Sequence, residues 1–313
     1  MPIDTSLIII HNSYFPILIV NDFFFTMPIS PKHIIFVEDL LINPKRKIMK
    51  IAIIGAGNMG GAVARGLAKG SLIQTSDIHV SNPSTPKLEA LKAEFPEINT
   101  STDNCTVARE ADMIILAVKP WKVVEVLEEL KPHLDYSRQA VASMVGGLGI
   151  AQLSEWLDKG DGTLPATYII IPNTAIATLS SMTFISSARS TAERDMQLLD
   201  IFNELGEAML IDESAMPAAT SLASCGIAYA MRYIRAAMEG GVELGIRAND
   251  AKHIVMQTLR GAVDVLAASD AHPEAEIDRV TTPGGLTIKG LNAMEAAGFT
   301  HSVIEGLRAS TKR

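Results

Sequence analysis

The stretch "KIAIIGAGNMGGAVARGLAKG", Lys50 to Gly70, decides how the rest of the chain is interpreted. Ile51 to Ile54 form a short apolar run, which is typical of a buried parallel strand. Gly55 to Gly60 then fit the pattern G-x-G-x-x-G, and Gly61 to Lys69 have the composition of a helix. A strand, a glycine turn and a helix in this order are the context in which that pattern binds a dinucleotide.

Each glycine of the pattern has its own physical reason. Gly55 permits the tight turn, Gly57 lets the backbone approach a pyrophosphate, and Gly60 lets the helix pack closely on the strand. The start of the helix then faces the phosphates. A chance glycine turn is the alternative, and the flanking strand and helix disfavour it. The stretch therefore predicts an α/β Rossmann-like dinucleotide-binding domain.

The second expected strand, in "IHVSNPS" from Ile78, bears on the choice of cofactor. An NAD-binding protein usually carries Asp or Glu just after this strand, to hold the ribose 2′-hydroxyl. This chain carries hydroxyls, an amide and an ammonium instead: Ser81, Asn82, Ser84, Thr85 and Lys87. These groups favour NADP(H), with NAD(H) as the second choice. The alternative is that they cap a helix starting near Pro86, and both interpretations can hold together.

The alternation of apolar runs and helical stretches continues to about residue 212. We expect further strands at Ala111–Val118, Ala140–Met144, Tyr168–Ile171, Met182–Ser186 and Ala208–Ile211, with helices up to Leu130 and from about Thr191 to Leu205. This pattern predicts a parallel sheet wrapped by helices, with ligands at the carboxyl ends of the strands. The residues expected at those ends are Asn58, Lys119, Gly146 and Asn173.

From Glu213 onward the pattern is helical only. One long helix is expected over 214–245 and ends at Gly245; a second runs from Asn249, its expected N-cap, to about Ser269. A third lies within Val280–Phe299 and a fourth over Thr300–Ser310. Their wide apolar faces predict burial against another subunit, with an ordinary monomeric bundle as the alternative. The expected domains are thus 49–212, which binds NAD(P), and 213–313, which is helical and serves dimerisation and substrate binding.

The first 48 residues differ from the rest. They are rich in Phe and Ile but show neither helical nor strand periodicity, and polar residues interrupt every apolar run. We interpret 1–48 as an extension outside the domains, with Met49 as the working start. A membrane-surface anchor is the weaker alternative, because basic residues are scarce.

The composition limits the kinds of partner that this protein is expected to bind. A net charge of −8 and a pI near 5.4 disfavour binding to nucleic acid or to anionic membranes. Cys105 and Cys225 lack the spacing of a metal site, so we expect no metal, reduced thiols and a cytoplasmic protein.

The stretch "VTTPGGLTIKGLNAMEAAGF", Val280 to Phe299, indicates the substrate chemistry. A helix that starts on Thr-Thr-Pro-Gly-Gly offers backbone N–H groups to a carboxylate, and Thr287 adds a hydroxyl. Residues 213–246 contain neither Lys nor His, which counts against alcohol chemistry. Tyr229 and Tyr233 stay open as proton carriers. A protonated imine, in contrast, accepts hydride without a strong acid in the wall.

From Met49 to its end the chain resembles the pyrroline-5-carboxylate reductase family, which reduces a cyclic imine to L-proline with NAD(P)H. Thr282 to Ile288, "TPGGLTI", is similar to the family signature S-P-G-G-x-T-I, and Met294 to Phe299 is similar to its late L-E-x-x-G-F. The motif A-V-K-P is matched by Ala117–Pro120, and N-T by Asn173-Thr174.

The resemblance implies a homodimer, often built into larger rings, and a set of site residues. The cofactor would be lined by Ile54, Gly55, Ala56, Gly57, Asn58, Met59, Gly60, Asn82, Ser84, Asn104, Ala117, Val118, Lys119, Pro120, Met144, Val145 and Gly146. The substrate would meet Asp278, Thr282, Gly284, Gly285, Leu286 and Thr287, and the catalytic residues would be Thr287 and Thr282.

The chain also departs from the family. Its S-G-S-G-P-A-Y is replaced by Ala223 to Tyr229, "ASCGIAY", and we expect this change to stiffen and enlarge a turn near the nicotinamide or the substrate. Three functions are therefore weighed: formation of proline, reduction of another small cyclic imine or oxo acid, and NADP binding without catalysis.

Overall fold

The computed structural model describes residues 8–10, 17–20, 23–25, 49–269 and 271–311, which fall into two units, Met1–Ile48 and Met49–Arg313. In the first unit, β1 (Ile8–Ile10), β2 (Ile17–Val20) and β3 (Phe23–Phe25) form an antiparallel sheet in the order β1-β2-β3. Such short strands leave no readable alternation in the sequence, which is why none was expected. The other residues of the expected extension lie outside the described ranges.

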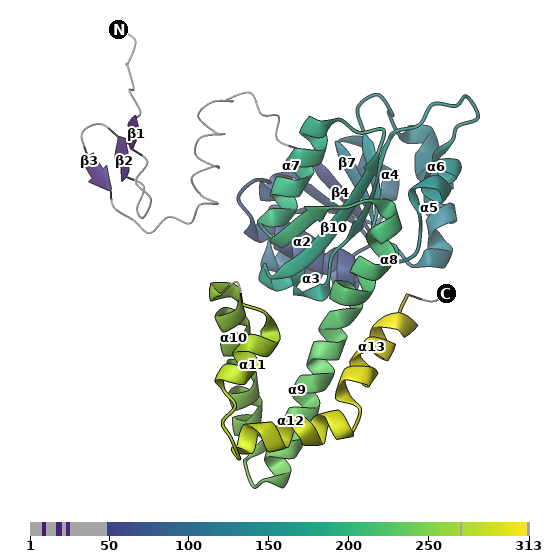
Figure 1. The fold of residues 1–313 in the computed structure, drawn as a ribbon. Helices are drawn as coiled ribbons and strands as arrows, with labels where there is room; N and C mark the ends of the chain where they lie inside the picture. The colour runs from purple at the N-terminus through teal and green to yellow at the C-terminus, as the bar shows by residue number, and fades with distance from the viewer. Residues whose placement is uncertain (1–7, 11–16, 21–22, 26–48, 270, 312–313) are drawn as a thin grey trace. The chain divides into compact units, whose positions relative to one another are not determined.

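The second unit begins with an eight-stranded sheet in the order β11-β10-β9-β8-β7-β4-β5-β6 (Figure 1). The strands are β4 (Ile51–Ile54), β5 (Ile78–Ser81), β6 (Asn99–Ser101), β7 (Met113–Leu116), β8 (Ala140–Ser143), β9 (Ala166–Ile171), β10 (Ser181–Ala188) and β11 (Gly206–Leu210). All neighbours pair in parallel except β9 and β10. Ile51 of the central strand β4 lies opposite both Ile78 and Met113. The expected Rossmann-like fold is confirmed.

Helices cover both faces of the sheet. One apolar core joins the sheet to α2 (Asn58–Lys69), α3 (Thr85–Glu94) and α7 (Ala192–Asn203). A second core lies on the other face, under α4 (Asn104–Arg109), α5 (Val123–Leu130) and α6 (Ile150–Leu157). The residues of β4, β7 and β8 are fully buried because both faces are covered, so β4 and β7 read as unbroken apolar runs and β8 differs only by the buried Ser143.

The expectation of a parallel sheet is wrong at one edge, because β10 runs antiparallel to β9 and β11 runs in the same direction as β10. Only residues 172–180 separate the two strands, and a parallel crossover needs about a dozen or more. Four further elements were not expected: β6, α4, α6 and, in the helical part, α11 (Pro273–Arg279). β6 is the polar edge strand Asn-Thr-Ser, and α4 and α11 have only 6 and 7 residues, so these three carry no strong periodic pattern. α6 does carry one, with Ile150, Leu153 and Leu157 buried at helical spacing, and was missed.

The helical part begins at Met216, and its first three elements follow one another without a break. It consists of α8 (Met216–Ala219), the π-helical segment η6 (Thr220–Cys225), α9 (Gly226–Glu243), α10 (Ala248–Ala268), α11, α12 (Leu286–Ala296) and α13 (Phe299–Ala309). The end of the first long helix near Gly245, which has φ +92°, is confirmed. No helix in the described ranges combines the length and apolar character that crossing a bilayer requires.

Three local expectations need correction. α2 begins at Asn58 rather than Gly61, and the N-cap of α10 is Arg247 rather than Asn249. Residues 223–227 do not form a turn; they span the end of η6 and the start of α9. Ile227, which stands where the family has proline, is the second residue of α9, a position in the first turn that accepts either residue.

Nε2 of His79, on β5, is buried and has no hydrogen-bond partner. It is the one such side-chain atom in the described ranges. Burial, and then the charge of Lys50, lower the pKa of this imidazole. In the unfolded chain the imidazole of His79 therefore takes up a proton near pH 6.5, whereas in the folded chain it stays neutral at that pH. Stability contributed by the neutral ring is present above that pH and is lost as the pH falls below it.

We predict that the urea midpoint falls between pH 7.5 and pH 5.5, and that His79→Leu reduces this fall. The exposed His133→Leu is the matched control, measured at one protein concentration because association shifts the midpoint. An equal acid sensitivity in both variants would contradict the role given to His79.

Candidate functional site

The glycine turn after β4 is closely packed. Gly55 has φ +107°, and a Cβ there would lie 2.8 Å from the carbonyl oxygen of Ala117. A Cβ on Gly60 would collide with the carbonyl oxygen of Gly55 and lie 2.9 Å from the Cβ of Ala117. The absence of both side chains lets α2 and the loop after β7 pack directly on the turn.

Gly57, in contrast, faces open space. It is the N-cap of α2, no side chain caps the helix, and no acidic residue lies in the first turn. A Cβ on Gly57 would meet nothing within 4 Å. The bare N–H groups at the start of α2 therefore suit a pyrophosphate, so the residues present fit a dinucleotide.

Asn82 and Asn104 hold the loops around this turn. Asn82 Oδ1 accepts a hydrogen bond of 3.1 Å from the N–H of Ala56, and its Nδ2 donates to the carbonyl oxygen of Ser84 at 2.9 Å. Asn104 Oδ1 accepts from the hydroxyl of Ser81 at 2.7 Å. Ser84 is the N-cap of α3, but its hydroxyl makes no capping bond, so the expected capping role is not seen.

The remaining residues expected at the cofactor lie at the carboxyl ends of β7 and β8. The N–H of Ala117 donates to the carbonyl oxygen of Ile54 at 2.9 Å, and the N–H of Met144 to that of Leu116 at 3.0 Å. Lys119 and Gly146 are exposed at this edge, beside the glycine turn. The structure thus brings the expected cofactor residues to one edge of the sheet.

Two hollows adjoin this edge. One has a volume of about 370 Å³ and is lined by Pro120, Val145 and Gly146 among apolar side chains. The other has a volume of about 530 Å³ and is lined by Gly57 and Asn58 of α2, by Lys87 of α3, and by Thr174 and Ala177. The last two were not among the expected site residues, although the Asn-Thr motif after β9 pointed to this loop.

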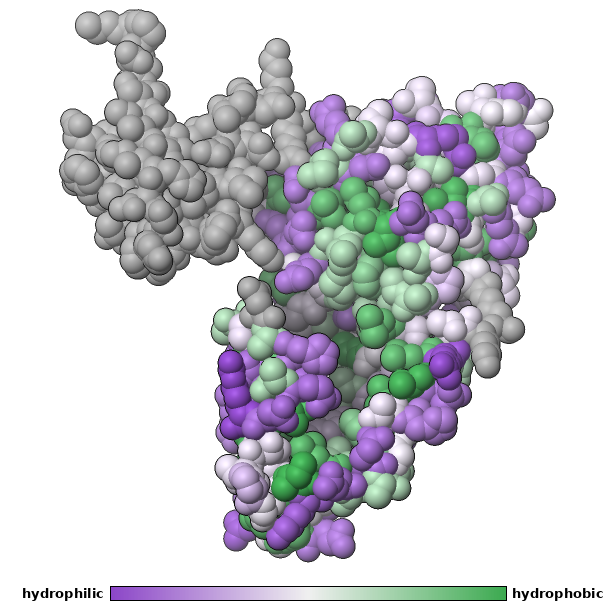
Figure 2. Space-filling model, viewed as in Figure 1, coloured by the Kyte–Doolittle hydropathy of each residue, from purple (hydrophilic) through white to green (hydrophobic). Residues whose placement is uncertain are grey.

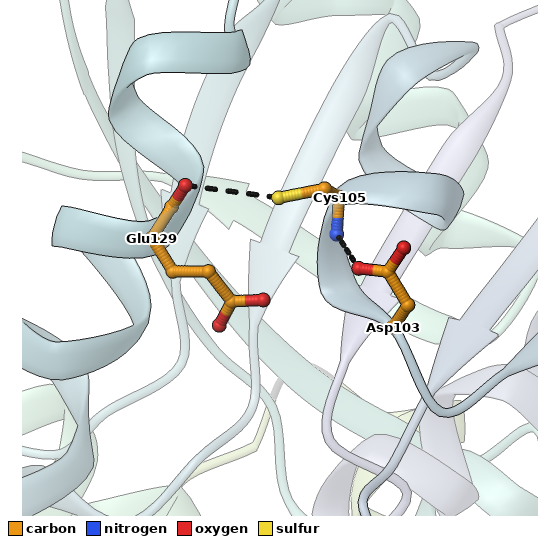
Figure 3. Close-up of side chains that lie close together, drawn as sticks. All are labelled: Asp103, Cys105 and Glu129. Carbon is orange, nitrogen blue, oxygen red and sulfur yellow. Dashed lines mark hydrogen bonds between the residues drawn. The ribbon is translucent and has the colours of Figure 1, made fainter.

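Asp103, Cys105 and Glu129 also lie close together, with potential ligand atoms within 4.8 Å of one another (Figure 3). Local bonds account for them. Asp103 caps α4 by accepting from the N–H of Cys105 at 2.9 Å, and the thiol lies 3.7 Å from the carbonyl oxygen of Glu129. Burial, Glu129 and Asp103 raise the pKa of Cys105. A thiol that stays protonated is a poor metal ligand.

The residues expected at the substrate lie on α11 and at the start of α12. Gly284 has φ +74°, Gly285 is the N-cap of α12, and no side chain caps the helix. Thr282 and Thr287 are exposed, and so is Asp278. The N–H of Gly285 donates to the carbonyl oxygen of Thr282 at 2.9 Å, which closes the turn.

Within one chain this helix start does not meet the cofactor edge. α12 lies at the end of the helical domain away from the sheet, with the length of α9 between them (Figure 1). Leu286 at its start is 86% exposed. The structure therefore gathers the residues expected at the cofactor in one place and those expected at the substrate in another.

The helical domain leaves apolar side chains uncovered, as the green areas of Figure 2 show. In α9–α13 only Ala251 is buried. Exposed large side chains include Met231, Leu244, Ile254, Val263, Val265, Leu286, Val303 and Ile304. Tyr229 donates to the carbonyl oxygen of Gly306 at 3.1 Å and Tyr233 packs edge-on against Phe299, so both tyrosines hold α13 on α9.

The chain combines a glycine turn of the dinucleotide-binding type, at the edge of a largely parallel sheet, with an all-helical domain that follows the sheet. This arrangement is typical of an NAD(P)-dependent oxidoreductase. A family model for the pyrroline-5-carboxylate reductase dimerisation domain matches residues 213–313, and one for coenzyme F420-dependent NADP oxidoreductases matches residues 50–146.

Known relatives agree with this class. The chain is 37% identical to pyrroline-5-carboxylate reductase 2 of Dictyostelium discoideum, over 84% of this chain and 91% of that protein. It is 31% identical to pyrroline-5-carboxylate reductase of Methanosarcina acetivorans, over 84% and 96%. The crystal structure of Plasmodium falciparum pyrroline carboxylate reductase with NADP bound matches with a TM-score of 0.76 and 28% identity, over 84% and 95%. The chain belongs to the pyrroline-5-carboxylate reductase family.

Substitutions at Gly57 and Gly60 distinguish the effect of the turn on cofactor binding from its effect on folding. We predict that Gly57→Val lowers the thermal midpoint only slightly, because its side chain enters open space and only the N-cap preference is lost, but weakens NADP⁺ binding by more than about tenfold. Gly60→Val should lower the midpoint, since overpacking costs about 1–3 kcal/mol or more. Calorimetric titration and thermal unfolding measure both. Tight binding by Gly57→Val would contradict a pyrophosphate at the start of α2.

Proposed function

We propose that the protein reduces 1-pyrroline-5-carboxylate to L-proline, with NADPH as the preferred hydride donor. The observation that carries this proposal is the uncapped start of α12, a Thr-Thr-Pro-Gly-Gly turn, in a chain of this family. The bound nicotinamide supplies the hydride. The protein's own residues have to hold a small anionic ring and bond its nitrogen.

The start of α12 suits the carboxylate of such a ring. Its first N–H groups have no partners within the helix and no capping side chain, so they are available to an anion. Thr287, the second residue of the helix, places a hydroxyl beside them for the ring nitrogen. Thr282 lies in the turn before the helix. Its hydroxyl oxygen is 2.6 Å from the position that a Cβ on Gly285 would take. We assign the catalytic contacts to Thr287 and Thr282, and substrate contacts to Gly284, Gly285, Leu286 and Asp278.

The preference for NADPH over NADH is part of the proposal. No carboxylate follows β5, where one would repel a 2′-phosphate, and the hydroxyl of Ser84 makes no capping bond. We place the reaction in the cytoplasm on the strength of the two free thiols.

The helix start cannot capture the substrate alone. A charge at a helix end contributes about 0.3–1 kcal/mol, and up to about 2 when partly buried, whereas millimolar binding requires about 4 kcal/mol. We therefore propose that the working site forms in a homodimer, where α12 of one copy meets the cofactor edge of the other. The uncovered apolar side chains of α9–α13 support this assembly, which larger rings could repeat.

The activity test is direct. Purified protein with NADPH and pyrroline-5-carboxylate should oxidise the cofactor and form proline. Oxidation only with other cyclic imines or with oxo acids would favour a related reductase. NADPH binding without any oxidation would favour a non-catalytic protein.

Thr287→Val should lower kcat by about tenfold or more, because a bond made to the ring nitrogen in the transition state is lost, while the Kd for NADPH stays the same. Thr258→Val, which removes a hydroxyl bonded within α10, is the matched control and should keep full activity. An unchanged kcat in Thr287→Val would remove this residue from the mechanism.

A shared site makes a further prediction. Gly57→Val damages the cofactor edge and Thr287→Val the substrate turn, so each pure variant should be nearly inactive at an NADPH concentration just sufficient to saturate the wild-type protein. In a mixed dimer, one site combines both intact parts. Unfolding and refolding the two together should therefore restore about a quarter of wild-type activity. No restoration, with mixed dimers shown by mass spectrometry, would place each site within one chain.

A further inference from the structure

The loop between β8 and α6, residues 144–149, is only partly held by packing. Val145 and Leu148 are buried, but Gly146 and Gly147 between them are exposed, and a Cβ on Gly146 would meet nothing within 4 Å. The loop lines the hollow of about 370 Å³ and also a second one of about 540 Å³, beside the start of the helical domain. Glycines lose more conformational freedom on ordering than other residues, so hydrogen bonds have to hold this loop.

A side chain from far along the chain supplies one of these bonds. Within the loop the bonds are local: the N–H of Val145 donates to the hydroxyl of Ser143 at 3.1 Å, and that of Leu148 to the carbonyl oxygen of Val145 at 3.3 Å. At the end of the loop, Glu213 Oε1 accepts from the N–H of Ile150 at 2.6 Å, across 63 positions of sequence. The carboxylate of Glu213 therefore fastens the point where the loop enters α6.

Gly149 makes room for this carboxylate. It is the N-cap of α6, no side chain of its own caps the helix, and the first turn of α6 holds no acidic residue. A Cβ on Gly149 would lie 2.8 Å from Glu213 Oε1. Its φ of −95° is open to any residue, so the missing side chain serves the approach of Glu213 rather than the backbone. A carboxylate at a helix start is also favoured by the helix dipole.

The segment that carries Glu213 is itself well held. Before it, the N–H of Ile211 donates to the carbonyl oxygen of Ile185 in β10 at 2.9 Å. After it, Met216 is buried in the apolar core that also contains residues of α6. Glu213 thus connects an ordered part of the chain, the passage from the sheet to the helical domain, with a loop rich in glycine.

The loop lies on the side of the sheet where the nicotinamide half of the cofactor is expected. The start of α2 after β4 suits the pyrophosphate, and the adenosine ribose is held after the next strand, which here is β5. β5 and β6 lie on one side of β4, whereas β7 and β8 lie on the other. The other half of a bound dinucleotide therefore extends toward the ends of β7 and β8, where this loop begins.

We propose that Glu213 is a positioning residue for the nicotinamide half, because its bond to the N–H of Ile150 holds the β8–α6 loop in the shape that receives this half. This rests on the cofactor of the proposed function but not on the imine. A loop that is ordered beforehand loses less entropy when a ligand binds. Removing the bond should weaken a ligand that carries the nicotinamide and spare one that lacks it.

The experiment is calorimetric titration of the full-length protein with NADP⁺, which carries the nicotinamide half, and with 2′,5′-ADP, which lacks it. Glu213→Ala should weaken NADP⁺ by about fivefold or more, as expected for one lost bond to a charged group, and should leave 2′,5′-ADP unchanged. Glu213→Gln should restore most of the NADP⁺ affinity, since its amide oxygen can accept the same bond. Glu155→Ala, exposed on α6, is the matched control and should change neither affinity.

Gly149→Ala tests the same contact with the carboxylate still present. Its methyl group would displace Glu213 and should weaken NADP⁺ in the same way, while adding little in a chain that already carries Glu213→Ala, because the two changes remove one interaction. Thermal unfolding shows which variants are folded at the titration temperature. If Glu213→Ala is not, Gly149→Ala decides alone, by weakening NADP⁺ and sparing 2′,5′-ADP.

Four results would overturn the assignment: equal weakening of both ligands, unchanged NADP⁺ affinity, no restoration by Glu213→Gln, or an equal effect of Glu155→Ala. The proposed function fails separately. A protein that reduces no imine but selectively loses NADP⁺ in Glu213→Ala keeps this inference and loses the enzymatic one. A protein that makes proline with unaltered NADP⁺ affinity in Glu213→Ala does the reverse.

Discussion

The close contact of β4, α2 and the loop after β7 is the constraint on which the cofactor edge depends. It exists because Gly55 and Gly60 carry no side chain where Ala117 and the backbone approach them. Side chains at these positions would push α2 away from the sheet and displace its N-terminus. A Cβ added to Gly57, which lies between these two glycines, would meet no atom within 4 Å. The packing that closes the turn therefore leaves the first N–H groups of α2 open toward the edge. Close packing thus depends on Gly55 and Gly60, whereas Gly57 is the glycine that we propose for phosphate binding.

The helical domain imposes the second constraint. Its α12 presents an uncapped start with Thr282 and Thr287, yet the length of α9 separates it from the cofactor edge of the same chain (Figure 1). Exposed apolar side chains along α9–α13 favour association with a second copy, which in the proposed dimer brings α12 to the cofactor edge of the partner. Association would bury these faces and would supply the binding free energy that one helix terminus lacks. In this account the oligomer is part of the active site rather than an addition to it.

Much of this organisation was readable from the sequence, for local reasons. The run Ile51–Ile54 and the glycines that follow it obey rules of backbone geometry that need no distant partner, and the wide apolar faces after Glu213 pointed to burial against another subunit. Distant contacts were less readable. The direction of β10 depends on a short connection through Thr174–Thr178, and β6 is a polar edge strand held by pairing with β5. The commitment of Asn82 to Ala56 and of Arg65 to Glu94 also needs the folded chain, because these partners lie 26 and 29 residues apart.

The central claim is that the start of α12 from one copy holds a small anionic ring against the nicotinamide bound to another. A crystal structure of the assembled protein with NADP⁺ and L-proline measures this directly. We expect the proline carboxylate within hydrogen-bonding distance of the N–H groups that begin α12, Thr287 beside the ring nitrogen, and the ring in contact with the nicotinamide bound by the partner. A structure in which that turn points into solvent, or in which proline lies away from the nicotinamide, would contradict the account.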